Sequence, residues 1–242
     1  MQIDINSKTI GELALEVPNA IPFMEMHHID FCCRGNRSVA EACREAGMDP
    51  SELLGKIGYL NGGALYDWEG RSLTDLQQYI VNTHHTYTRQ AVETITLLAE
   101  KVARRHGANH VEVMVVRDLA LELAGDLLPH MAKEEQILFP CVEALEGGSS
   151  PDACFGTIAN PIRAMMFEHE AAGEKLAELR RVTCDYSLPD DACLSFRALY
   201  ESLAALERDL HQHIHLENNL LFPRAVSLEE ATAARPLLEP VG

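Results

Sequence analysis

The sequence predicts an all-α protein, built as an up-down-up-down four-helix bundle preceded by a small helical N-terminal domain. Residues that favour helices, chiefly Leu, Ala and Glu, are abundant, while aromatic residues make up only 6% of the chain. Four long segments between residues 72 and 226 carry apolar residues at helical spacing and are joined by short connections. With 242 residues, 47% of them apolar, the chain is long enough to bury a sizeable core.

The small helical domain is expected over residues 1–57. Two capping boxes, Thr9 with Glu12 and Ser38 with Glu41, predict the starts of two of its helices. In a capping box, the hydroxyl and carboxylate side chains satisfy backbone N–H groups that are left free at the start of a helix. The turn between these two helices carries a pair of adjacent cysteines.

The other boundaries follow from glycine, proline and capping signals. Ser72 is expected to cap the first bundle helix, and Asn160 with Pro161 to open the third. The glycine-rich stretch before Ser72 has the composition of a linker. The chain is thus divided into a linker at residues 58–71, a bundle at residues 72–226 and a C-terminal tail at residues 227–242.

The charge balance excludes several classes of partner. Twenty Lys and Arg against 37 Asp and Glu give a formal net charge of −17, which repels nucleic acid and anionic lipid. No secretory signal is visible, and no apolar run approaches the roughly 18 residues that a membrane span needs. Seven cysteines without framework spacing fit reduced thiols. We therefore expect a cytoplasmic protein, a monomer or a homodimer, with no nucleic-acid or membrane partner.

One motif occurs twice and marks the expected functional site. The pattern H-x3-E-x4-F-P spans residues 130–140 and recurs at residues 213–223. A His and a Glu four residues apart lie on one face of a helix, where an imidazole nitrogen and a carboxylate can bind the same divalent metal ion. Both pairs also fall on the apolar stripe of their helix, at positions where Leu would be expected. The repeat therefore predicts metal ligands inside the bundle.

Each of the other two bundle helices places one histidine on its apolar stripe, His84 in the first and His169 in the third. A lone inward-facing histidine is more often an ordinary core residue. The order His, H-x3-E, His, H-x3-E nevertheless makes a pseudo-repeat of two helical hairpins. Buried without a partner, these groups would cost many kcal/mol, which two divalent cations would offset. We therefore predict a dinuclear site of Fe, Mn or Zn, with the two Glu as bridges, formed by His84, His130, Glu134, His169, His213 and Glu217.

The remaining histidines are predicted not to bind the metal. His211 and His215 lie four residues apart but point away from the apolar stripe, so we expect them at the surface or behind a ligand. Glu135 lies one residue off the stripe and is interpreted as a solvated charge or a support for a ligand. No role in the site is assigned to His85, His106 and His110, which lie on no apolar stripe.

Four blocks of the sequence are specific enough to indicate a family. They are the segment Ile29-Asp30-Phe31-Cys32-Cys33 and residues 130–140, 168–173 and 213–223. Together they resemble the RIC (repair of iron centres) proteins, the ScdA/YtfE/NorA/DnrN group, which carry a hemerythrin-like domain. The resemblance covers nearly the whole chain. After the two cysteines, however, this chain has Arg34-Gly35-Asn36 where the family often has Gly-Gly.

The resemblance implies a hemerythrin-like bundle that holds two non-haem Fe ions. It implies that four histidines are terminal ligands and that two glutamates, with an oxo group, are bridges. The terminal ligands would be His84, His130, His169 and His213, and the bridges Glu134 and Glu217.

The resemblance also implies a role in the nitrosative and oxidative stress response. The protein would bind nitric oxide and help to repair damaged iron–sulfur proteins by supplying iron. Cys32 and Cys33 are then candidate catalytic thiols for the transfer of iron or NO, although small domains also bury cysteines as simple apolar residues. Two other functions stay open, a module that binds NO or O2 without donating iron, and a di-iron NO reductase.

Overall fold

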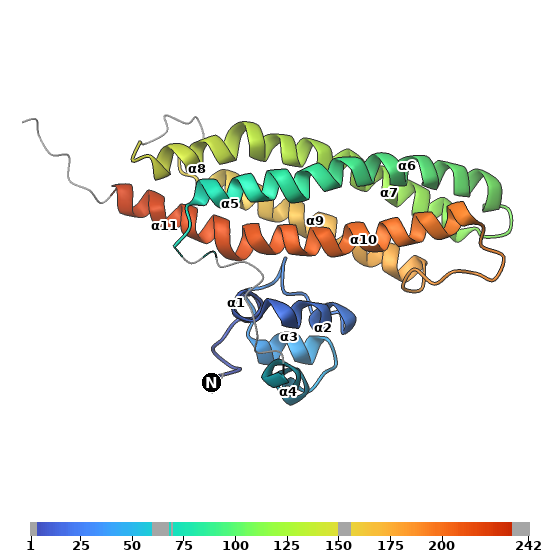
Figure 1. The fold of residues 1–242 in the computed structure, drawn as a ribbon, viewed down its shortest axis with the longest axis horizontal. Coiled ribbons are helices and arrows are strands. Elements are labelled where there is room, and N and C mark those ends of the chain that lie inside the picture. The colour runs from blue at the N-terminus through green and yellow to red at the C-terminus, as the bar shows by residue number, and fades with distance from the viewer. Residues whose placement is uncertain (1–3, 60–67, 69, 150–155, 234–242) are drawn as a thin grey trace, which may run out of the picture.

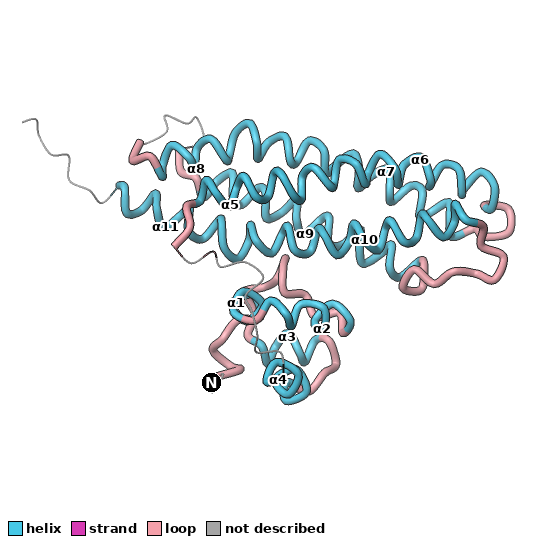
Figure 2. Tube along the Cα trace, viewed as in Figure 1, coloured by secondary structure: helices cyan, strands magenta, loops and turns pink. Residues whose placement is uncertain are grey.

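The computed structural model describes residues 4–59, 68, 70–149 and 156–233, which form a four-helix bundle with a small helical domain beside it (Figure 1). The predicted fold class is confirmed. In the described residues, the one strand-type pairing is a single bridge between Thr9 and Ser38, and helices joined by loops make up the rest (Figure 2). Among the helices described, none is long and apolar enough to cross a membrane.

Two helices of the N-terminal domain begin where the capping boxes predict. The side chains of Thr9 and Ser38 each accept a hydrogen bond from the backbone N–H three residues on, and both boxes are complete. Gly47, with φ +68°, follows the second capped helix, where glycine adopts the left-handed conformation that commonly ends a helix. The elements of this domain are α1 (Ile10–Glu16), η1 (Pro18–Ala20), α2 (Ile21–Met26), α3 (Val39–Glu45) and α4 (Pro50–Tyr59). Of the predicted linker, residues 60–67 and 69 lie outside the described residues.

Each long helix of the bundle except the third is built from two α-helical pieces joined by a short π-helical turn. The first helix comprises α5 (Leu73–Ile80), η2 (Val81–His85) and α6 (Thr86–His106). The second comprises α7 (Glu112–Lys133), η3 (Glu134–Leu138) and α8 (Phe139–Glu146). The third is α9 (Ala159–Val182), and the fourth comprises α10 (Leu194–Leu216), η4 (Glu217–Leu221) and α11 (Phe222–Ala233).

Two predicted boundaries differ from the structure. Ser72 caps α5 as predicted, because its side chain accepts a hydrogen bond from Asp75 N–H. The third helix instead begins at Ala159, one residue before Asn160, so Asn160 lies inside the first turn and does not cap it. The fourth helix continues to Ala233, and residues 227–233 of the expected tail are therefore helical. Helical hydrogen bonding simply continues past the proline of the second H-x3-E-x4-F-P motif.

The bundle contains two apolar cores that are separated along its length. One is formed mainly by α6, α7, α9 and α10, with residues such as Ile95, Leu123 and Leu203. The other lies towards α5, α8 and α11, with residues such as Leu76 and Phe222. The three π-helical turns fall between these cores, and turns of this kind are frequent at functional sites. The wider turns thus mark the level of the bundle at which function is expected.

The small domain docks on the bundle beside α10 (Figure 1). Ile214 of α10 is buried in the apolar core of the small domain. Asn219 of η4 donates hydrogen bonds of 3.3 Å to the carbonyls of Phe31 and Cys32. The chain at Gly35 passes so close that a Cβ there would lie 2.4 Å from Asn219 Oδ1 and 2.6 Å from the Phe31 carbonyl oxygen. The docked position therefore requires glycine at residue 35.

We expect Gly35→Ala to lower the free energy of unfolding by about 1–3 kcal/mol, since the added methyl group meets backbone as well as side-chain atoms. Chemical denaturation of the full chain measures this change. Gly55→Ala is the matched control, because Gly55 lies inside α4 and a Cβ there would have no heavy atom within 4 Å. At this position Ala should stabilise by roughly 0.5–1 kcal/mol. Equal effects of the two substitutions would contradict the docking account.

Candidate metal centre

Six side chains of the kinds that bind metal ions meet inside the bundle at the level of the π-helical turns. Each is at most 4% exposed, and the four long helices all contribute. Their nitrogen and oxygen atoms form two overlapping groups, each with all its ligand atoms within 4.8 Å of one another, that share both glutamates. The cluster consists of His85, His130, Glu134, His169, His213 and Glu217.

The first half of the cluster pairs a histidine of the first helix with one of the fourth. His85 Nε2 lies 3.1 Å from His213 Nε2. A carboxylate oxygen of each glutamate completes this half. Glu134 Oε2 is 3.4 Å from His85 Nε2, and Glu217 Oε1 is 3.1 Å from His213 Nε2.

The second half repeats this arrangement with the second and third helices. His130 Nε2 lies 3.0 Å from His169 Nε2. The other oxygens of the same glutamates face this pair, because Glu134 Oε1 is 3.3 Å from His130 Nε2 and Glu217 Oε2 is 3.2 Å from His169 Nε2. Each glutamate therefore offers one oxygen to each half, and each half draws on both helical hairpins of the pseudo-repeat.

These distances fit two metal ions. Two ligand atoms at right angles on one ion, with bonds of about 2.1 Å, lie about 3 Å apart, which matches the spacing within each pair of Nε2 atoms. Both oxygens of Glu134 and Oε2 of Glu217 are buried and accept no hydrogen bond within the described residues. Ionised oxygens left in this way are strongly disfavoured without a cation. The residues present thus suit a dinuclear centre bridged by two carboxylates.

The charges of the cluster point to the same conclusion. Burial opposes ionisation of Glu217, yet the neighbouring His213 and His169 lower the pKa of Glu217 well below its usual value. Burial also opposes protonation of His130, but the charges of Glu134 and Glu217 raise the pKa of His130 to about 9. The carboxylates therefore stay ionised only by keeping positive charge beside them, which is what two divalent ions supply.

Polar contacts on the outer nitrogens orient three of the four imidazoles. Nδ1 of His85 lies 2.6 Å from Glu135, and Nδ1 of His130 lies 2.9 Å from Glu168. Nδ1 of His169 lies 2.9 Å from the side-chain oxygen of Asn218. Such contacts fix the ring and strengthen it as a ligand, and they are typical of metal-binding histidines. The supporting role of Glu135 was one of its two predicted interpretations, whereas Glu168 and Asn218 were recognised only as parts of the resemblance blocks.

The structure contradicts the choice of His84 as a ligand and places His85 in the cluster instead. His84 is buried next to the cluster, where its ring stacks on His213 at 5.5 Å, but its Nδ1 contacts Asp209 at 3.0 Å. The physical reason is the π-helical turn η2, which holds one more residue than an α-helical turn. A periodicity of 3.6 residues therefore predicts that His84 faces the bundle interior, whereas the wider turn directs His85 into the cluster.

The two histidines predicted to point away from the apolar stripe face the small domain. His215 is buried, with Nδ1 3.3 Å from the carbonyl oxygen of Phe31, so the prediction of a surface position is wrong for this residue. Burial lowers the pKa of His215 to about 4, and the ring is therefore neutral at pH 7. His211 lies 3.6 Å from Glu25 of α2. Both side chains serve the contact between domains.

The two adjacent cysteines contact the backbone of His169 and the side chain of Asn218, which in turn contacts the imidazole of His169. Cys33 Sγ is 3.6 Å from the carbonyl oxygen of His169, and the Cys32 carbonyl accepts a hydrogen bond of 3.3 Å from Asn218. Asn218 thus contacts the cysteine loop with its amide nitrogen and His169 with its amide oxygen. Asp30 Oδ1, Cys32 Sγ and Cys33 Sγ form a further group of possible ligand atoms within 4.8 Å of one another.

Comparisons with known proteins agree with this arrangement. Residues 78–225 match the model of the hemerythrin HHE cation binding domain, and residues 6–61 match that of ScdA_N, a domain of unknown function. The iron–sulfur cluster repair protein YtfE of Yersinia pseudotuberculosis serotype IB (strain PB1/+) is 35% identical over 229 residues, which cover 93% of this chain and 99% of that protein. The chain belongs to the RIC family of hemerythrin-domain proteins. YtfE of Yersinia pestis (strain Pestoides F), also 35% identical over the same share of both chains, is a second RIC relative.

In this RIC protein we expect His85→Asn to lose one of the two metal ions, because Asn keeps a nitrogen near the position of Nδ1 but has no counterpart to Nε2. His84→Asn is the matched control and should keep both ions, since it too can preserve the contact to Asp209. Elemental analysis of the purified chains measures the ions per chain. Loss of metal from the His84 variant alone would contradict the assignment of His85.

Glu168→Ala should weaken metal binding about 10–100-fold while leaving every proposed ligand in place, because His130 loses the carboxylate that orients it. Competition with a chelator measures the affinity. Glu170→Ala serves as the control, since Glu170 is on the same helix but lines the cleft between the domains. Equal affinities of the Glu168 variant and the wild type would argue against an orienting role.

Proposed function

We propose that this chain is a non-haem di-iron protein of the nitrosative and oxidative stress response. In this proposal it binds nitric oxide and helps to repair iron–sulfur clusters by supplying iron. The observation that carries the proposal is the position of the cysteine pair against the helix that holds His169, with Cys33 Sγ 3.6 Å from the backbone carbonyl oxygen of this cluster residue. The name of the YtfE relatives, iron–sulfur cluster repair protein, supports the same role.

Iron is the metal that the family relationship favours for the buried cluster. Imidazole and carboxylate ligands also suit manganese and zinc, so the ligands alone do not choose. In each half, two imidazole nitrogens and two carboxylate oxygens give four protein ligands, fewer than the six positions of an octahedral ion. When bound, a pair of ferrous ions supplies open coordination positions for NO. The chain itself contributes a dry pocket and fixed ligands.

The cysteine loop supports a route for iron as cargo. Cys32 Sγ lies 3.8 Å from Cys33 Sγ and 3.5 Å from Asp30 Oδ1. The hydrogen bond to Cys33 and burial raise the pKa of Cys32 well above its usual value, so Cys32 rests as a neutral thiol. A metal ion deprotonates a thiol that coordinates it. Cys32 would therefore lose its proton and become a ligand only when ferrous iron binds to this group of three side chains. That behaviour suits a transfer site rather than a permanently reactive thiolate.

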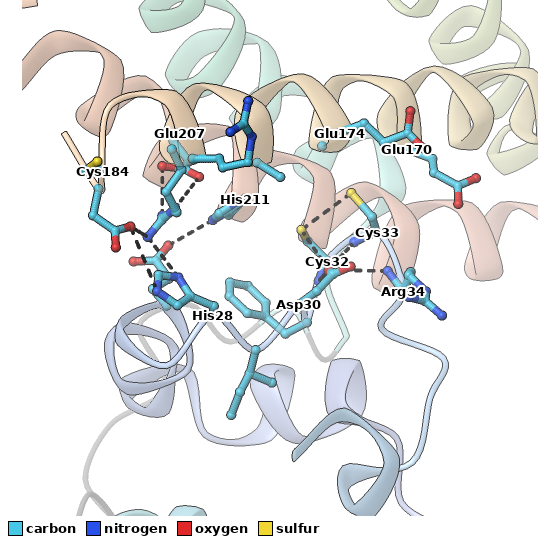
Figure 3. A pocket seen from close by; sticks show the side chains of 18 residues that line it. His28, Asp30, Cys32, Cys33, Arg34, Glu170, Glu174, Cys184, Glu207 and His211 are labelled. Atoms are coloured by element: carbon cyan, nitrogen blue, oxygen red, sulfur yellow. Dashed lines mark hydrogen bonds and ion pairs between the residues drawn. The ribbon is translucent and has the colours of Figure 1, made fainter. Parts of the chain in front are cut away.

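A cleft between the two domains leads to these thiols. It has a volume of about 720 Å³ and is lined by both cysteines and by charged residues of α9 and α10 (Figure 3). Glu170 and Glu174 lie on the side of the cleft near Cys33, and Glu207 lies farther along (Figure 3). Glu207 forms an ion pair of 2.8 Å with Arg180, which also lines the cleft. Acidic residues near the thiols would favour a cation over an anion. In this proposal the cleft is the exit for ferrous iron towards a damaged protein.

The test is reactivation of a dehydratase whose [4Fe–4S] cluster has been destroyed by NO. We expect the iron-loaded chain to restore more activity than the same amount of free ferrous iron. A variant with both Cys32→Ser and Cys33→Ser should keep the iron bound inside its helical bundle and should restore several-fold less dehydratase activity. Cys184→Ser is the matched control, because Cys184 is an exposed free thiol of the same cleft.

Three outcomes separate this proposal from its alternatives. Reactivation no better than that by free iron would contradict iron supply. Tight NO binding without loss of iron, unchanged in the double cysteine variant, would instead favour a module that only captures NO or O2. Repeated turnover of NO to N2O would establish a di-iron NO reductase.

A further inference from the structure

A second group of metal-binding side chains lies at the far end of the bundle, away from the cluster of ligands. His106 ends α6, His110 lies in the loop that follows, and Asp191 precedes α10. One ligand atom from each of these three lies within 4.8 Å of those of the other two. Cys193, at the start of α10, places Sγ 3.1 Å from His106 Nε2. Neither histidine lies on an apolar stripe, so periodicity predicts no role for either.

We propose that His106, His110, Asp191 and Cys193 form a separate zinc-type site that ties the loop after α6 to the loop before α10. Imidazole, carboxylate and thiolate are the ligand types that zinc takes in proteins, usually four at a time. Asp191 and a thiolate at Cys193 together balance the charge of one divalent ion. The site is distinct from the buried cluster and independent of the repair function.

The backbone and the packing hold the two imidazoles ready. The N–H of His110 donates a hydrogen bond of 2.8 Å to the carbonyl of His106, which keeps the two residues on one tight turn. The buried ring of Phe196 lies beneath both, with centroids 5.3 Å from His106 and 5.7 Å from His110. The rings therefore need little ordering when an ion binds.

The contacts around His110 are those of a metal-binding histidine. Its Nε2 lies 2.9 Å from Asp191 Oδ1, while its Nδ1 lies 3.2 Å from Glu112. A carboxylate on the far nitrogen of a ligating imidazole is a common support for zinc ligands. Asp191 is largely exposed, so an ion can enter from solution.

Two cationic side chains lie beside the site. Lys101 and Arg105 line a hollow that also contains His106 and Cys193. Their positive charge opposes a free divalent ion, whereas a metal ion that binds a thiol deprotonates it and gains the thiolate as a ligand. A thiophilic ion such as zinc therefore suits the site better than calcium or magnesium, which prefer oxygen ligands.

The test uses the full chain with its core metal in place and with Cys32→Ser and Cys33→Ser, so that the thiols of the proposed transfer site take up no zinc. This reference chain is dialysed against buffered zinc, and core metal and zinc are counted separately by elemental analysis. We expect one zinc per chain beyond the core metal. His110→Asn and Asp191→Asn, both in loops at the bundle end, should lose this zinc and keep the core metal. Cys184→Ser should keep both, because that thiol lies outside the group.

Cobalt in place of zinc tests the thiol directly. The reference chain should show a thiolate-to-cobalt charge-transfer band, and the further substitution Cys193→Ser should remove it. The proposal would be overturned if the reference chain took up no zinc beyond its core metal, or if His110→Asn and Asp191→Asn in that chain bound as much zinc as the reference. A cobalt spectrum without the thiolate band would remove Cys193 from the site.

Discussion

The cost of placing two carboxylates in a dry helical core governs this structure. Glu134 and Glu217 are fully buried, and between them they face four imidazoles. Such a group is stable only when positive charge lies among the carboxylate oxygens. The bundle therefore has an apolar core on either side of this level and ligands at the level itself. Three of the four helices have a π-helical turn at this level, and His85, Glu134 and Glu217 lie in these turns.

The small domain is coupled to the same cluster through few residues. Asn218 follows the bridging Glu217 in the chain and contacts both His169 and the loop that carries the cysteines. Asn219 and Ile214 hold the rest of that loop and its domain against α10. A change in the position of His169 would therefore shift Asn218 and, through it, the loop that carries the cysteines. The fold thus supplies a physical connection between the metal cluster and the thiols, which the proposed transfer of iron requires.

Sequence periodicity predicted the fold class and five of the six cluster residues, because the repeated H-x3-E pairs lie on regular apolar stripes. It chose His84 instead of His85 because a π-helical turn leaves no mark in the spacing of apolar residues. The group formed by His106 and His110 with Asp191 was not predicted for a different reason. Residues at the end of a helix belong to no apolar stripe, and only the tertiary structure brings these two histidines close to Asp191. The contact of Cys33 with α9 likewise depends on domain docking, which local patterns do not encode.

The most direct test is anomalous X-ray diffraction at the metal absorption edge from crystals of the metal-loaded chain. The account predicts two strong peaks inside the bundle, one bound by His85 and His213 and the other by His130 and His169. Glu134 and Glu217 should each bind both ions. A single peak at this level, or an ion bound by His84 in place of His85, would contradict the account.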